Sequence, residues 1–254
     1  MRIIIIVFMF FAPLYCFAAP TPQQLLSNSY QLIVVSTPSW NAINGQLQRF
    51  TRDSTHASWK AVGKSIAIVV GKHGLGWDPR ISYLHDQTAI KHEGDGLTPV
   101  GVYAIKPIFG FAKQYHQKAD YFLLTNTSVC VDDVKSIYYN QLIDGSKVTQ
   151  KDWNSGEHMR QVPQYKLGAM IQYNTTPVVP GAGSCIFMHI WKNPTSGTAG
   201  CIAMEESNLK QTLAWLRPNQ HPVIVIFPMQ IYKDMQSAWR LPRYPVQNTD
   251  GHYI

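Results

Sequence analysis

Cys201 and His189 are the residues in this sequence whose types and spacing best suit covalent chemistry. A cysteine thiolate is a nucleophile, and a neighbouring histidine can accept its proton and later donate a proton to a leaving amine. The 11 residues between them, 190–200, are rich in Gly, Ser, Thr and Pro. A loop of this composition can bring Cys201 back over His189, so the pair predicts nucleophilic catalysis.

Cys185 lies closer to His189 in the sequence but does not suit the role of nucleophile. Four residues of a predicted strand separate the two, which is about 13 Å at roughly 3.3 Å per residue. Alternation places Cys185 and His189 on one face of this strand, and the other face is purely apolar (Ile186, Met188 and Ile190). The apolar face is predicted to join the core, so His189 points away from it.

The N-terminus has the three-part layout of a secretory signal peptide. Met1-Arg2 is positive, residues 3–15 are almost all apolar, and Cys16-Phe17-Ala18-Ala19 supplies small residues for cleavage. The apolar run is about 13 residues, whereas a membrane span needs roughly 20. We therefore predict a leader over residues 1–18, with a retained anchor as the alternative. We expect a mature protein in the periplasm or cell envelope, with no stable membrane span.

The cysteine count supports a free thiol at Cys201. The chain has 4 cysteines, and Cys16 falls in the predicted leader. An odd number then remains in an oxidising compartment, so at least one thiol is unpaired within the chain. Cys130 and Cys185 both fall in predicted strands, and we expect a disulfide between them.

Two local features favour reactivity at Cys201. Small residues precede it (Thr198-Ala199-Gly200), which leaves the Gly200 backbone N–H accessible as an oxyanion donor. A predicted helix over about Glu205–Leu216 follows, and its N-terminus would favour a thiolate, as would the nearby His189. The alternative is an ordinary buried thiol beside a strand histidine.

The rest of the chain predicts a single, mainly β domain. Short runs rich in Val, Ile, Tyr and Phe recur between Gly, Pro and Asn clusters, and the helix after Cys201 is the one principal helix. We place the catalytic domain at residues 30–228 and a C-terminal extension at residues 229–254, with a surface tail from Arg240. Strands are predicted over residues 31–35, 59–70, 100–105, 121–131, 169–173, 185–191 and 223–227, and a hairpin turn over residues 43–46.

Charge and motif content exclude several classes of function. The formal net charge is +7, but the basic residues are scattered, so no nucleic-acid partner is expected. An exported basic protein instead suits an anionic envelope polymer. The sequence has no HExxH motif, which disfavours a metallopeptidase, and we expect no metal and no cofactor.

Several motifs together resemble one family. His189 followed by Thr198-Ala199-Gly200-Cys201-Ile202 is similar to the His…(Ser/Thr)-x-Gly-Cys signature of YkuD-type (ErfK/YbiS-like) L,D-transpeptidases. The segment 94–103 (GDGLTPVGVY) resembles the TPxGxY element of that family. Residues 132–133, 138–140 and 183–187 are similar to one branch of this family. The whole resemblance extends over about residues 31–227. It implies a mixed β-sandwich or barrel-like fold.

The resemblance also implies a reaction. Cys201 would attack the carbonyl of an L-centre in a peptidoglycan stem peptide, Gly200 and Cys201 N–H groups would hold the oxyanion, and His189 would protonate the leaving D-alanine. An amine acceptor would then resolve the thioester, by cross-linking or by D-amino-acid exchange. A backbone carbonyl is expected to orient His189. Residues expected at the peptide groove are Thr198, Trp191, Trp153 and Tyr138, although aromatic residues of this kind are often simple packing residues.

Two positions depart from the family pattern. Ile202 is followed by Ala203, where Arg is common, and His189 is followed by Ile190, where Gly is common. The substrate carboxylate would therefore need another cation, Arg160 or Lys192. Two other functions stay open, namely an L,D-carboxypeptidase or endopeptidase that uses the same Cys-His pair, and a non-catalytic envelope-binding module.

Overall fold

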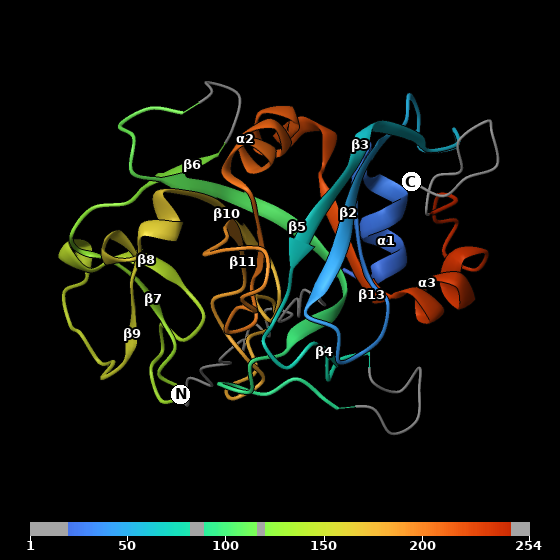
Figure 1. Ribbon diagram of the computed structural model, residues 1–254. Helices are drawn as coiled ribbons and strands as arrows, with labels where there is room; N and C mark the ends of the chain where they lie inside the picture. Colours follow the sequence, from blue (N-terminus) through green and yellow to red (C-terminus); the bar gives the residue numbers. More distant parts are fainter. Residues whose placement is uncertain (1–19, 82–88, 116–119, 245–254) are drawn as a thin grey trace, which may run out of the picture.

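A computed structural model describes residues 20–81, 89–115 and 120–244 (Figure 1). The predicted leader lies outside the described residues. The described chain forms a larger and a smaller β-sheet, with helices against the larger one. The larger sheet contains β1 (Gln31–Thr37), β2 (Asn44–Thr51), β3 (Lys60–Val69), β4 (Leu75–Trp77), β5 (Thr98–Gly110), β6 (Tyr121–Leu123), β10 (Leu167–Ile171), β11 (Phe187–Ile190), β12 (Ile202–Met204) and β13 (Val223–Pro228). The smaller sheet contains β7 (Ser128–Val131), β8 (Leu142–Asp144) and β9 (Gly156–His158).

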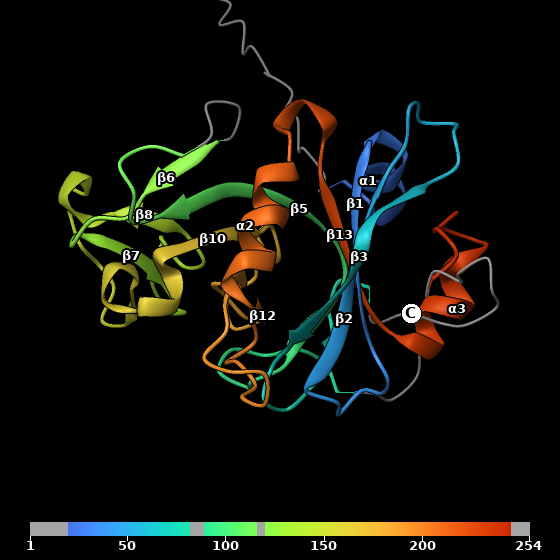
Figure 2. The ribbon, with the colours of Figure 1, turned by 45° about the horizontal axis from the view of Figure 1, so that its top comes forward.

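The larger sheet closes on itself. Hydrogen-bonded neighbours follow the order β10-β11-β12-β3-β2-β1-β13-β5-β4, and β10 also pairs with β5. The strands from β10 to β5 therefore form a ring, to which β4 and β6 add along β5. The long strand β5 runs from one half of the molecule to the other (Figure 2). The mainly β, barrel-like fold expected from the sequence is confirmed.

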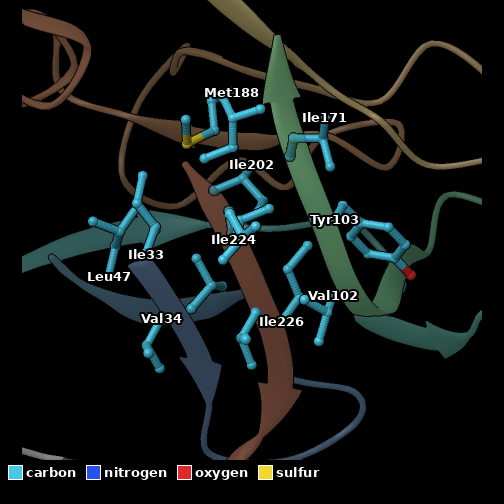
Figure 3. Close-up of a cluster of buried hydrophobic side chains, with 14 of the residues drawn as sticks. Ile33, Val34, Leu47, Val102, Tyr103, Ile171, Met188, Ile202, Ile224 and Ile226 are labelled. Atoms are coloured by element: carbon cyan, nitrogen blue, oxygen red, sulfur yellow. The ribbon is translucent and has the colours of Figure 1, made fainter. Parts of the chain in front are cut away.

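The main core lies around the adjacent strands β1 and β13. Every residue of these two strands is buried, which matches their nearly unbroken apolar sequences, and they pair in parallel. Figure 3 shows side chains of β1 and β13 gathered with others from the strands around the ring. Burial on both faces of these strands requires cover on both sides. The other strands of the ring cover the inner face, and α3 (Met229–Gln236) packs against β1 and β13 from outside.

In the part of the chain that the structure describes, three α-helices lie against the larger sheet. They are α1 (Pro22–Asn28), α2 (Glu206–Trp215) and α3 (Met229–Gln236). In both ribbon views α1 and α3 lie on one side of β13 and β2, and α2 lies on the other (Figures 1 and 2). None of the helices in the described ranges has the length and apolar character needed to cross a membrane.

The smaller sheet is joined covalently to the larger one. Its strands follow the order β8-β7-β9, and it lies beside β10 and β11 (Figure 1). The expected disulfide is confirmed: Cys130 of β7 is bonded to Cys185, two residues before β11, and Cys201 is free. The bond closes a loop with a sequence separation of 55 residues.

Two expectations about strands are wrong. Residues 121–131 form two strands in different sheets, because the turn at 125–127 separates β6 from β7. The predicted hairpin turn at 43–46 is largely the start of β2, and the connection from β1 is made by residues 38–43. Glycine is needed at position 45 of this strand because it has no side chain: an added Cβ would lie 2.5 Å from the Ser36 carbonyl oxygen.

Helices α1 and α3 were not expected. Helix α1 begins with a capping box in which Thr21 and Gln24 bond each other's backbone N–H, with Pro22 at its first turn. The sequence of α1 is mostly polar, so no apolar periodicity predicted a helix there. Helix α3 lies in the segment predicted as an extension, and it buries Tyr232.

The expectation of a surface tail from Arg240 is wrong for residues 241–244, and the rest of that predicted tail, residues 245–254, lies outside the described residues. Leu241 and Tyr244 are buried in the main core, and so is Trp239, whose ring lies 5.5 Å from that of Phe227 in β13. The Tyr232 hydroxyl donates to the Pro242 carbonyl oxygen at 2.7 Å. Residues 239–244, which follow α3, are therefore part of the folded domain.

We predict that Trp239→Ala lowers the free energy of unfolding by about 3–5 kcal/mol, because it leaves a cavity against β13. Denaturant unfolding followed by intrinsic fluorescence or circular dichroism measures this change. Lys233→Ala, on the exposed side of α3, is the control and should stay within about 0.5 kcal/mol of the parent protein. Equal effects of the two substitutions would contradict a structural role for this segment.

Candidate active site

Parallel pairing of β11 with β12 places His189 and Cys201 on one face of the sheet. Met188 lies opposite Ile202, and His189 lies opposite Ala203. Cys201 immediately precedes β12, so it is a diagonal neighbour of His189, two residues along the adjacent strand. With strands about 4.8 Å apart and about 3.3 Å per residue, the two Cα atoms lie roughly 8 Å apart, which side chains can bridge.

The two faces of β11 belong to different clusters. Met188 and Ile202 join the main core, as expected for the apolar face. Phe187 and Cys201 join a second buried cluster. His189, only 7% exposed, follows Phe187 on this second face. The site is therefore assembled in a compartment separate from the main core.

The Cys201 thiol is buried and hydrogen-bonded. The Phe187 N–H donates to Sγ at 3.3 Å, and the thiol donates to the Cys185 carbonyl oxygen at 3.5 Å. Burial raises the pKa of the Cys201 thiol well above its usual range, and the negative charge of Glu157 adds to this shift. The expectation that His189 would lower this pKa is wrong for the resting protein, because the cost of burying a thiolate is larger.

The helix N-terminus that was expected to favour a thiolate at Cys201 is not adjacent to this residue. Strand β12 lies between Cys201 and α2, which begins at Glu206. Three strand residues span about 10 Å, whereas the effect of a helix dipole falls off within the first turn. The N-cap residue Glu205 already accepts hydrogen bonds from Ser207 N–H and Asn208 N–H.

His189 is held as a neutral imidazole. Its Nδ1 lies 2.8 Å from the Ile190 carbonyl oxygen. A carbonyl can only accept, so Nδ1 carries the proton and Nε2 is the basic nitrogen. The expectation that a backbone carbonyl orients this ring is confirmed. Burial lowers the pKa of His189 to about 4, although the hydrogen bond to Ile190 opposes the shift.

Two threonines fix the backbone before and at Cys201. The Thr98 hydroxyl lies 2.8 Å from the Gly200 carbonyl oxygen and 3.3 Å from that of Cys201. The Thr198 hydroxyl donates to the Cys201 carbonyl oxygen at 2.6 Å and accepts from Gly200 N–H at 3.1 Å. Thr98, the threonine of the TPxGxY element, therefore bonds directly to the cysteine loop.

These contacts change the expected roles of backbone N–H groups. The Gly200 N–H, expected to bind an oxyanion, is already bonded to Thr198. Within the described ranges, the Cys201 N–H has no hydrogen-bond acceptor. Gly200 is required for another reason: its φ is +144°, and an added Cβ would lie 2.9 Å from the Leu97 carbonyl oxygen. Cys201 N–H is thus the better candidate donor.

A pocket of about 260 Å³ opens above the pair. It is lined by residues of the 3-10 helix η4 (Pro163–Lys166) and the residue before it, by His189, and by the loop that leads to Cys201. The lining residues are Val162, Gln164, Tyr165, His189, Lys192, Ser196, Gly197, Thr198, Ala199 and Cys201. A cavity of about 1080 Å³ beside α1 and β5 includes neither His189 nor Cys201.

Only some of the expected substrate-binding residues line this pocket. Thr198 does, and so does Lys192, whereas Arg160 stacks over the Phe111 ring at 4.1 Å. Tyr138 and Trp153 pack edge to face in a small cluster with β7, at a centroid distance of 5.5 Å. Trp191 follows β11 and is half-buried without lining the pocket.

The sequence missed residues that reach the site from distant segments. Tyr165 lines the pocket, and its ring lies edge-on to that of His189 at 5.1 Å. Glu157 and Lys91 both act electrostatically on Cys201. Glu157 lies in the three-residue strand β9 and Tyr165 in the single turn η4, and both elements are too short to show a periodicity or a motif, so no local signal could have identified these residues.

Comparison with known proteins supports the family resemblance drawn from the motifs. A family model described as the YkuD L,D-transpeptidase catalytic domain matches residues 31–225, which is well over half of the chain. The matched range spans His189, Cys201 and the TPxGxY element, and the match shows the family that the motifs resemble. Curated proteins and solved structures gave no match.

We predict that His189 makes the protein less stable as the pH falls from about 6.5 to about 4. In this range the unfolded chain binds a proton at this residue and the folded chain does not, so acid favours unfolding. The accumulated loss is up to about 3 kcal/mol. Denaturant unfolding at several pH values, compared between the parent protein and His189→Gln, measures it; parallel curves for the two proteins would contradict the assignment.

Proposed function

Because this chain belongs to the YkuD family of L,D-transpeptidase catalytic domains, we propose that it is a cysteine acyltransferase acting on peptidoglycan stem peptides in the cell envelope. The observation that carries the proposal is that the free Cys201 and His189 share one face of paired strands and line the same pocket. A nucleophile and a base so placed suit acyl transfer.

In the first half-reaction the Cys201 sulfur attacks the carbonyl carbon at an L-centre of the stem. His189 Nε2 accepts the thiol proton, and its protonated ring then donates to the departing D-alanine as the carbon–nitrogen bond breaks. The neutral resting states of both groups, caused by burial, favour proton transfer during attack over a preformed ion pair. The Cys201 N–H would hold the oxyanion.

In the second half-reaction an amine attacks the thioester and Cys201 leaves as the thiol. Lys192 is the cation at the pocket rim that is available to a substrate carboxylate, in place of the Arg that is common after the nucleophile in the family. The family's Arg position is occupied here by Ala203, which is fully buried between β11 and β3. Recognition of a substrate carboxylate is therefore left to Lys192, in the loop between β11 and Cys201. Export by the predicted leader, residues 1–18, and a catalytic domain over residues 30–228 complete the proposal.

We predict that the purified protein converts a tetrapeptide-bearing muropeptide to cross-linked or D-amino-acid-exchanged product. Cys201→Ala should lower product formation by at least about a thousandfold, because removal of a nucleophile removes the covalent route. Chromatography with mass spectrometry measures the products. Tripeptide alone would indicate a hydrolase that uses the same pair, and undiminished product from Cys201→Ala would rule out the cysteine mechanism.

A carbapenem gives an independent test of the nucleophile. Its strained lactam carbonyl should acylate Cys201, and intact-protein and peptide mass spectrometry should find the adduct on that residue alone. Cys201→Ala should gain no mass. An adduct elsewhere, or none, would count against the assignment of Cys201 as the acylated residue.

A further inference from the structure

The chain that leads into β11 holds the Cys201 sulfur through its backbone. The Phe187 N–H donates to Sγ at 3.3 Å, and the thiol donates to the Cys185 carbonyl oxygen at 3.5 Å. Phe187 is the first residue of β11, and Cys185 lies two residues before it. The direction of the Cys185 carbonyl therefore decides where the thiol points in the resting site. The proposed mechanism gives no role to the residues that fix Cys185.

Cys185 has a backbone conformation that needs support. Its φ is +55°, in the left-handed region, which costs free energy for a residue other than glycine. Such a conformation persists only where neighbouring contacts impose it. Two groups hold this buried residue: its sulfur is bonded to Cys130, and its N–H donates to the side-chain oxygen of Asn140 at 2.9 Å.

Both of these groups are attached to β7 of the smaller sheet. Cys130 lies in β7, and the Asn140 N–H donates to the carbonyl oxygen of Val131, the last residue of β7, at 2.8 Å. The Asn140 side chain is also fixed, because its amide donates to the carbonyl oxygens of Tyr173 and Asn174, both at 2.8 Å. With Asn140 only 2% exposed, each N–H of the amide and its oxygen has a protein partner.

Two of the segments that resemble one branch of the family meet at this point. Residues 138–140 contain Asn140, and residues 183–187 contain Cys185. A second bond joins the same segments, since the Gly183 N–H donates to the Tyr139 hydroxyl oxygen at 3.1 Å. The contacts give the two segments a common role, which is to fix the chain that leads into β11.

We propose that Asn140 is a positioning residue for the nucleophile and acts through Cys185. Its side chain, with the disulfide as a second tether, holds the Cys185 carbonyl where it accepts the hydrogen bond of the resting thiol. The sulfur is thereby kept in one place. When attack begins, the S–H turns from the Cys185 oxygen to Nε2 of His189, which takes the proton as in the proposed mechanism. This inference rests on the proposed role of Cys201 as nucleophile.

A positioning role and a purely structural role have different kinetic effects. Loss of a residue that only supports the fold reduces activity through the unfolded fraction of the protein. Loss of a positioning residue moves the sulfur in protein that is still folded, and a misplacement of about 1 Å can cost about a hundredfold in rate. Asn140 does not line the pocket, so substrate binding should not change. We therefore expect kcat to fall while KM stays the same.

The test is Asn140→Gly, assayed for turnover of the tetrapeptide-bearing muropeptide and for acylation of Cys201 by a carbapenem. Glycine adopts the left-handed conformation of this position (φ +62°), so the substitution removes the side-chain bonds without adding backbone strain. In the folded variant kcat and the acylation rate should fall at least about tenfold, with KM within about twofold of the parent value. Thermal unfolding of each protein sets an assay temperature at which it is folded.

Asn174→Gly is the matched control. Asn174 is also a buried asparagine with a left-handed backbone (φ +53°), and its amide makes three hydrogen bonds, to Val179 and Gly183. None of the three reaches Cys185. This variant should lose stability as Asn140→Gly does but keep a kcat near that of the parent. Equal losses of kcat in the two folded variants would mean that Asn140 only supports the fold, and would overturn the proposal.

Reduction of the disulfide releases Cys185 without a substitution. A phosphine reductant converts the bond between Cys130 and Cys185 to two thiols, and water supplies the two protons and the oxygen of the phosphine oxide. After the reductant is removed under nitrogen, the reduced protein should show the same pattern, a lower kcat with an unchanged KM. If Asn140→Gly does not fold, this measurement decides, because an unchanged kcat in folded, reduced protein overturns the proposal.

The outcomes distinguish this inference from the proposed function. Turnover that is lost in Cys201→Ala but unchanged in folded Asn140→Gly overturns the positioning role and leaves the cysteine mechanism intact. A parent protein with neither turnover nor a carbapenem adduct overturns both. A fall in kcat at constant KM in Asn140→Gly and in the reduced protein, but not in Asn174→Gly, supports the positioning role.

Discussion

Parallel hydrogen bonding between β11 and β12 brings the thiol and the imidazole together, and most of the surrounding structure serves to maintain it. Parallel strands usually need a crossover of a dozen or more residues, often a helix. Here the connection is a short loop that is itself fixed to the sheet. Thr198 bonds the backbone of Val70 and Lys72 at 2.9 Å and 2.8 Å, and Thr98 contacts the carbonyl of Cys201. The register of the pair thus depends on contacts with β3 and β5.

Burial sets the electrostatic character of this pair. Both side chains lie in a low-dielectric cluster, which disfavours the thiolate and the imidazolium alike. A resting site of two neutral groups costs less free energy than a buried ion pair that lacks full compensation. The hydrogen bond to the Ile190 carbonyl fixes the imidazole proton on Nδ1 and leaves Nε2 as the basic nitrogen.

The smaller sheet completes the site from outside the ring of strands. Its β9 contributes Glu157, and the segment that follows leads to Tyr165, which closes one wall of the pocket. The disulfide between Cys130 and Cys185 ties this sheet to the chain just ahead of β11. The acidic group and the cysteine therefore belong to different layers of the fold, and their proximity depends on how those layers dock.

The sequence by itself determined the elements with strong local signals. Continuous apolar runs identified β1 and β13, alternation separated the two faces of β11, and composition and motif identified Cys201 and His189. It could not determine that Cys201 precedes a strand instead of a helix, since three apolar residues fit either. The contact between Glu157 and Tyr165, and the direction of the Cys201 pKa shift, were decided only by tertiary structure. Each depends on desolvation and on contacts between segments distant in sequence, which no local pattern encodes.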